Sequence, residues 1–151
     1  MGVFDKEIKI FRDIKRNMIP TVIDALKRFD FVIVDFVTNK QMQKKGEDGK
    51  GDTIGRGKYS PGYARIRIKR GLQVNHIDLR FSGKFHADIE VITEGDQFKI
   101  NSKVVYADDL VKRYGIDILN VQQQYLEEFV NNYLIPQIKR MMNDELAKPT
   151  N

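Results

Sequence analysis

The chain has 151 residues, 41% hydrophobic and 31% charged, and contains no cysteine. This length predicts one domain, residues 1–151, that can bury a core without disulfides or metal ions. The lack of cysteine excludes a disulfide scaffold, a thiol nucleophile and a cysteine-ligated zinc or iron–sulfur site. The longest strongly apolar stretch, residues 31–37, is far shorter than the roughly 20 residues of a membrane helix, so we expect no membrane partner.

The net charge of +5 is unevenly distributed. Residues 1–80 hold 18 Lys and Arg against 10 Asp and Glu, whereas residues 81–151 hold 8 against 11. Much of the basic excess falls within residues 40–70, which could face nucleic acid or an acidic protein partner, or could be a solvated surface. The candidates for a subunit interface or a DNA channel are Lys44, Lys45, Lys50, Arg56, Lys58, Arg65, Arg67, Lys69 and Arg70.

The first third of the chain predicts a helix, a strand and a loop. Residues 3–28 predict a helix because apolar residues recur at three- and four-residue steps, and Pro20 predicts a kink or two segments. Residues 31–37 are β-branched and aromatic, which favours a strand. Residues 44–58 hold five of the chain's 11 glycines, so we expect a long flexible loop that adds little to the core.

A short element follows this loop. Ser60 before Pro61 is typical of a helix start. Residues 65–70 begin with an alternation of basic residues and isoleucine, Arg-Ile-Arg-Ile-Lys, which fits either a helix ended by Gly71 or a short strand.

A β-hairpin is the clearest prediction of the second half. Residues 85–91 and 98–101 alternate apolar and polar side chains about a turn at residues 94–96. This pattern indicates one buried face, which includes Phe85, and one solvent-exposed face.

Helices are expected on the C-terminal side of the hairpin. Residues 105–114 predict a short helix stopped by Gly115, and residues 121–145 predict a long helix with a kink at Pro136. The tail, residues 147–151, is expected to fray. The predicted fold is therefore α+β, a small and mostly antiparallel sheet with a central β-hairpin, flanked by long N- and C-terminal helices.

Catalytic motifs are scarce. His76 and Asp78, like His86 and Asp88, lie two residues apart, so on a strand each pair would share one face and could bind a metal or transfer protons. With two histidines and no cysteine in the chain, a solvated polar face is the favoured interpretation. We therefore expect no enzyme activity, no metal and no cofactor.

Phosphate-binding and base-stacking signals are also weak. Gly57-Lys58 is followed by Tyr59, where a P-loop requires Ser or Thr. Tyr59 and Tyr63 could stack on the bases of a single strand, although two tyrosines four residues apart usually pack against the body of a domain.

The order of motifs from Gln41 onward is specific. A flexible segment leads into Tyr59-Ser-Pro-Gly-Tyr-Ala and then into a basic stretch that ends at Gly71-Leu72. Three further features follow: His76-Ile-Asp-Leu79, a Ser-Gly step that begins at Phe81 and leads into the β-hairpin, and a Tyr-Ala segment that begins at Val105 and leads onto a short helix. This order over residues 41–120 resembles the small head–tail connector, neck and tail-completion proteins of tailed bacteriophages, especially those of phages that infect Bacteroidetes, the crAss-like phages included.

The resemblance implies a structural protein of the virion that is assembled in the host cytoplasm. Such proteins form rings, often of six or twelve copies, which contact portal, adaptor or tail proteins and surround the packaged DNA. A basic lumen would contact DNA without reading its sequence, because phosphate contacts carry no base information. The alternative function is a small basic nucleic-acid-binding module that uses residues 40–70.

Overall fold

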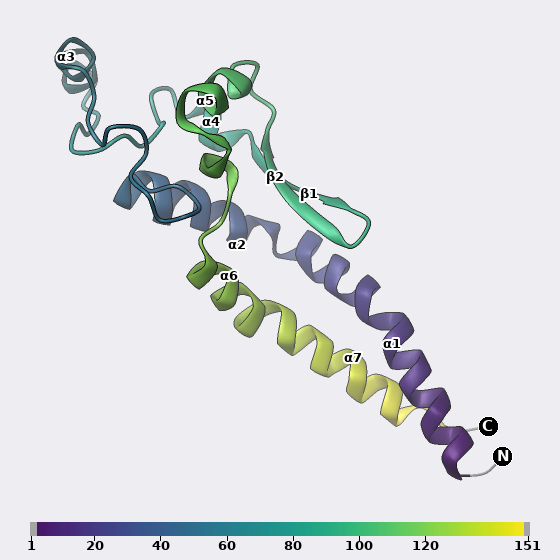
Figure 1. Cartoon of the computed structure of the whole chain (residues 1–151). Coiled ribbons are helices and arrows are strands. Elements are labelled where there is room, and N and C mark those ends of the chain that lie inside the picture. Colours follow the sequence, from purple (N-terminus) through teal and green to yellow (C-terminus); the bar gives the residue numbers. More distant parts are fainter. Residues whose placement is uncertain (1–2, 150–151) are drawn as a thin grey trace. The chain divides into compact units, whose positions relative to one another are not determined.

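The computed structural model describes residues 3–149, and it confirms the α+β class. In chain order, a long helix precedes and another follows a two-stranded antiparallel sheet, and Figure 1 labels these elements. The sequence indicated one domain, whereas the described residues group into two compact units. The first unit is formed by the segments before Asp30 and after Leu126, and the second unit by Asp30–Leu126. Within the described range, no helix combines the length and the apolarity needed to cross a membrane.

The first unit is built on α1 (Val3–Arg28) and α7 (Ile135–Ala147), which lie side by side and run in opposite directions (Figure 1). Asn17 of α1 donates a hydrogen bond to Glu145 of α7 at 2.8 Å. A kink or a division into two segments was expected at Pro20, and the division is wrong because α1 continues through this residue. The reason is that a proline removes only one backbone hydrogen bond, which the packing of a long helix can offset.

The predicted C-terminal helix is present, but its hydrogen-bonding pattern changes from α-helical to π-helical and back along its length. It consists of α6 (Gln123–Phe129), a π-helical turn η3 (Val130–Leu134) and α7. Pro136, expected at a kink, is the second residue of α7, two residues after the end of the π-helical turn, and its missing N–H is one reason why regular α-helical bonding breaks in this region. The helix ends at Ala147, and residues 150–151 of the tail that was expected to fray lie outside the described part of the chain.

The strand predicted over residues 31–37 is wrong, since these residues form α2 (Asp30–Asp35) and the start of the π-helical segment η1 (Phe36–Gln43). Val32, Ile33, Phe36 and Val37 are all buried. Their spacing of one and four residues places them on one side of a helix, and a short apolar run cannot distinguish this arrangement from a strand.

The β-hairpin is confirmed. Strands β1 (Ile89–Glu94) and β2 (Gln97–Ser102) pair antiparallel, with Ile89 opposite Ser102 and Glu94 opposite Gln97. The first strand begins later than predicted, because residues 84–87 form the short helix α4 (Lys84–Ala87). Phe85 is nevertheless buried, as expected.

The glycine-rich segment 44–58 packs against the rest of the second unit. The backbone N–H of Gly46 donates to Met42 O, that of Gly49 to Asp117 O and that of Ile54 to Gly46 O, at 2.8–2.9 Å. Ile54 is 1% exposed, so the expectation that this segment adds little to the core is wrong. A Cβ on Gly46 would lie 2.7 Å from His76, so glycine here permits close packing as well as its positive φ of 66°.

Three further helical segments belong to the second unit. Residues 65–70 belong to α3 (Pro61–Lys69) and its C-cap rather than to a strand, and Ser60 caps the helix by accepting from the Tyr63 N–H at 3.4 Å. The predicted helix at 105–114 is α5 (Ala107–Tyr114), which ends at Gly115 as expected. A short 3-10 helix, η2 (Ile116–Leu119), follows it.

Candidate functional site: a buried polar network beside a basic pocket

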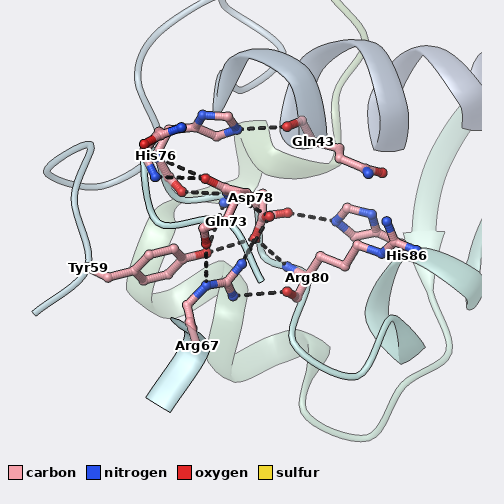
Figure 2. A network of polar contacts seen from close by, with 9 residues as sticks. Gln43, Tyr59, Arg67, Gln73, His76, Asp78, Arg80 and His86 are labelled. Atoms are coloured by element: carbon pink, nitrogen blue, oxygen red, sulfur yellow. Dashed lines mark hydrogen bonds and ion pairs between the residues drawn. The ribbon is translucent and has the colours of Figure 1, made fainter. Parts of the chain in front are cut away.

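The second unit contains a buried ion pair between Arg67 of α3 and Asp78 (Figure 2). Arg67 is 1% exposed. One terminal nitrogen of its guanidinium donates to both carboxylate oxygens of Asp78, at 3.0 and 3.1 Å. The other two nitrogens donate to Gln73 O and Arg80 O, each at 2.9 Å. All three guanidinium nitrogens are therefore engaged, as a buried charge requires.

Asp78 accepts several further hydrogen bonds. Its donors are the Tyr59 hydroxyl at 2.8 Å, the Gln73 amide at 2.6 Å and the Arg80 N–H at 2.9 Å. Burial alone would raise the pKa of Asp78, but these donors and the charge of Arg67 outweigh it and hold the pKa below its usual range. The carboxylate is thus charged in the folded protein at neutral pH.

The Tyr59 ring lies against the same ion pair, with its centroid 4.2 Å from the Arg67 guanidinium carbon. Burial raises the pKa of the Tyr59 hydroxyl, so this group remains a proton donor to Asp78. The side chain of Tyr59 is therefore held by a cation–π contact on its ring and by a hydrogen bond at its tip.

The side chains of both histidines contact backbone carbonyl oxygens. His86 Nε2 lies 2.7 Å from Asp78 O, and His76 Nε2 lies 2.7 Å from Gln43 O (Figure 2). His86 and Asp78 were expected on solvated faces, which is wrong: both are buried, because the hydrogen bonds of this network replace those of water. Burial lowers the pKa of His86 and keeps its ring neutral.

The polar groups of the network satisfy one another. Among the described residues, no buried side-chain nitrogen or oxygen lacks a hydrogen-bond partner, and no three His, Asp or Glu side chains are grouped to hold a metal ion. Buried polar groups that satisfy one another fix a local structure, so we assign this network the role of holding the segments around α3 in place.

A pocket of about 1100 Å³ lies directly beside the network. Tyr59, Arg67 and Arg80 belong to both the network and the pocket wall. The end of the glycine-rich segment adds Arg56 and Lys58, and α5 adds residues that include Arg113 and Tyr114. Elements distant in the sequence therefore converge on one cavity.

The structure distributes the nine basic candidates among different environments. Arg56, Lys58 and Arg67 line the pocket. Lys45 lies 3.8 Å from Glu47, and Lys50 forms an ion pair of 2.8 Å with Asp117. The remaining candidates are exposed and outside the pocket lining: Lys44, Arg65, Lys69 and Arg70. Arg67 is buried, so it cannot meet a partner in the way that an exposed cation could.

Sequence reasoning gave no role to two of the pocket's cations, Arg80 and Arg113, or to three of its rings, Phe81, Tyr106 and Tyr114. The two arginines carry no local motif, whereas Phe81 and Tyr106 belong to the Ser-Gly and Tyr-Ala motifs, which do not indicate a pocket. Tyr59 and Tyr63 were considered, and their rings lie 5.3 Å apart in an edge-on contact at the pocket wall.

The chain matches no known protein-family profile, no curated protein and no solved structure.

Proposed function

We propose that this chain is a structural subunit of the head–tail connection of a tailed bacteriophage, and that copies of it form a ring around the DNA channel. The proposal rests on the motif order over residues 41–120 and on one structural observation, an exposed apolar face of α1. The ring would contain six or twelve copies, bind portal, adaptor or tail proteins, touch packaged DNA without sequence specificity and reside in the virion after assembly in the host cytoplasm. Its role would be structural rather than catalytic.

The exposed apolar face of α1 consists of Ile8, Phe11 and Ile19, and Phe11 is 72% exposed. At about 100° per residue, these three side chains lie on one side of the helix, and the buried Leu26 near the end of α1 lies on the same side. The apolar face of α1 is therefore covered near the C-terminal end of the helix and exposed at Ile8, Phe11 and Ile19, where its spacing suits packing against another helix. In a ring, each copy presents this face to the same neighbouring surface, so a second copy of the chain would cover it.

The mass of the purified protein, measured by light scattering across concentration, tests this proposal. We expect species larger than one chain, and Phe11→Ser should return them toward the monomer because it places a hydroxyl in the apolar contact. The matched control is Phe31→Ser, a similarly exposed phenylalanine (63%) in the other unit, which should leave assembly unchanged. A protein that stays monomeric at every concentration, or a Phe11→Ser variant that assembles normally, would reject the ring.

The alternative is a nucleic-acid-binding module that uses residues 40–70. It predicts that the monomer binds DNA tightly at low salt and releases it as salt rises. Three of the nine basic candidates within this stretch, Lys45, Lys50 and Arg67, already contact carboxylates of the same unit. These contacts reduce the charge available to a phosphate backbone, so we place this function second.

A further inference from the structure

The pocket beside the network has an unusual charge balance. Its lining contains five cationic side chains and no Asp or Glu among the residues that the structure describes. Arg67 is neutralised by Asp78. The other four, Arg56, Lys58, Arg80 and Arg113, form no ion pair within the described part of the chain. Four uncompensated positive charges around one cavity favour an anionic occupant.

The same cavity is rich in aromatic rings. Tyr63 contacts Tyr59 at a centroid distance of 5.3 Å and Phe81 at 5.6 Å, so these three rings form a connected row. Tyr106 and Tyr114 also line the cavity. Rings at a pocket wall provide faces or edges against which a planar group can pack.

The wall is held in place before any ligand arrives. The Tyr59 hydroxyl is bonded to Asp78, and the Arg80 backbone contacts both Asp78 and Arg67. A Cβ on Gly55 would lie 3.1 Å from the Tyr114 ring, so the glycine-rich segment also packs closely against this wall. A preformed wall lowers the entropy cost of binding, because fewer side chains must be ordered.

We propose that this pocket binds a nucleotide unit, with the base against the aromatic row and the phosphate against the unpaired cations. Three of the four unpaired cations are arginines, whose planar guanidinium matches phosphate oxygens in pairs. The volume of about 1100 Å³ lies just above the usual range for small-molecule pockets, roughly 300–1,000 Å³, so one or two nucleotides fit. The unit is either a free nucleotide or part of a single strand.

An acidic peptide is the other anionic partner to consider. An acidic peptide matches the cations of the lining through its carboxylates, but glutamate and aspartate side chains have no flat ring to pack against the aromatic row. A nucleotide matches both features, because its phosphate is anionic and its base is planar. The chemistry of the lining therefore favours the nucleotide, and the peptide becomes an outcome of the test.

The test is titration calorimetry of the full chain with adenosine diphosphate, an eight-residue deoxyadenosine strand, an abasic strand of equal length and an eight-residue glutamate peptide. We expect adenosine diphosphate or the strand to bind, and the abasic strand to bind more weakly because it has phosphates without bases. Binding of adenosine diphosphate alone would identify a free nucleotide, and preference for the strand would identify single-stranded nucleic acid.

Variants locate the binding. Arg80→Gln and Arg113→Gln should each weaken binding by about tenfold or more, since each removes a charge-assisted hydrogen bond. Arg65→Gln removes the same charge from an exposed site outside the pocket lining and should change the affinity less than about twofold. A denaturation curve for each variant separates lost binding from lost folding.

Three results would overturn the proposal. They are the absence of binding by both adenosine diphosphate and the strand at low salt, equal binding of the abasic and complete strands, and tighter binding of the glutamate peptide than of either nucleotide probe. The proposal does not depend on the ring, because the pocket lies wholly within Asp30–Leu126 and the light-scattering experiment tests assembly separately.

Discussion

One guanidinium nitrogen of Arg67 contacts both carboxylate oxygens of Asp78, at 3.0 and 3.1 Å, and both side chains are almost completely buried. The two residues come from different segments, α3 and the stretch that follows it. Their pairing fixes one segment against the other, and Tyr59 and Arg80 at the pocket wall depend on the same contacts. The pair therefore connects the stability of the second unit to the shape of its pocket.

Removing the arginine should destabilise the protein strongly. Arg67→Met leaves the Asp78 carboxylate buried without its counter-charge, and we expect a loss of about 3–5 kcal/mol in the free energy of unfolding. Arg65→Met makes the same change two residues away at an exposed position, where we expect an effect within about 0.5 kcal/mol. Urea denaturation measures both, and similar effects at the two positions would show that the ion pair is not buried in solution.

The neutral state of His86 should make stability depend on pH. Burial lowers the pKa of His86 in the folded state, so at mildly acidic pH the unfolded chain binds a proton at this ring more readily than the folded chain does. Stability is therefore full above the ordinary histidine pKa of about 6.5 and declines as the pH falls from there toward the lowered value. Below that range, protonation of Asp78, whose pKa is also lowered, removes further stability.

The replacement His86→Gln tests this assignment, because an amide can donate to Asp78 O without titrating. The variant should lose most of the decline below pH 6.5, whereas His76→Gln retains His86 and should retain the decline. Free energies of unfolding from urea curves at several pH values check this, and an unchanged pH profile in His86→Gln would contradict the burial of the ring.

The glycine-rich segment should matter for folding. Ile54→Ala removes buried methyl groups from the core and should cost about 2–5 kcal/mol. Ile116→Ala is the same chemical change at an exposed position of the same unit and should cost far less. Thermal and urea unfolding compare the two, and equal costs would mean that the segment does not pack onto the unit in solution.

Replacing glycine by alanine should have opposite effects on stability at Gly49 and Gly62. A Cβ on Gly49 would lie 2.3 Å from the Cβ of Asn120 and 2.6 Å from its backbone, so Gly49→Ala should destabilise by about 1–3 kcal/mol. Gly62 lies in α3 with nothing within 4 Å of its Cβ position, so Gly62→Ala should stabilise by about 0.5–1 kcal/mol. Melting temperatures that move in the same direction would contradict this packing.

The sequence by itself determined the elements whose formation depends on residues that are close together in the chain. The apolar period of α1, the Ser60-Pro61 start of α3, the alternation in the hairpin and the stop at Gly115 are all local signals, each confirmed by the structure. A cap or a turn is decided by atoms within a few residues, so its pattern is readable in the chain.

Only the tertiary structure decided which side chains are buried and which converge. Residues 31–37 have the composition of a strand, but they form a helix because one side of that helix is covered by the rest of the unit. Arg67 was predicted as an exposed cation, but it is buried because Asp78, Gln73 and Arg80 supply partners for its guanidinium. Contacts between segments far apart in the chain leave no periodicity in the sequence, so neither the network nor the pocket could be predicted from it.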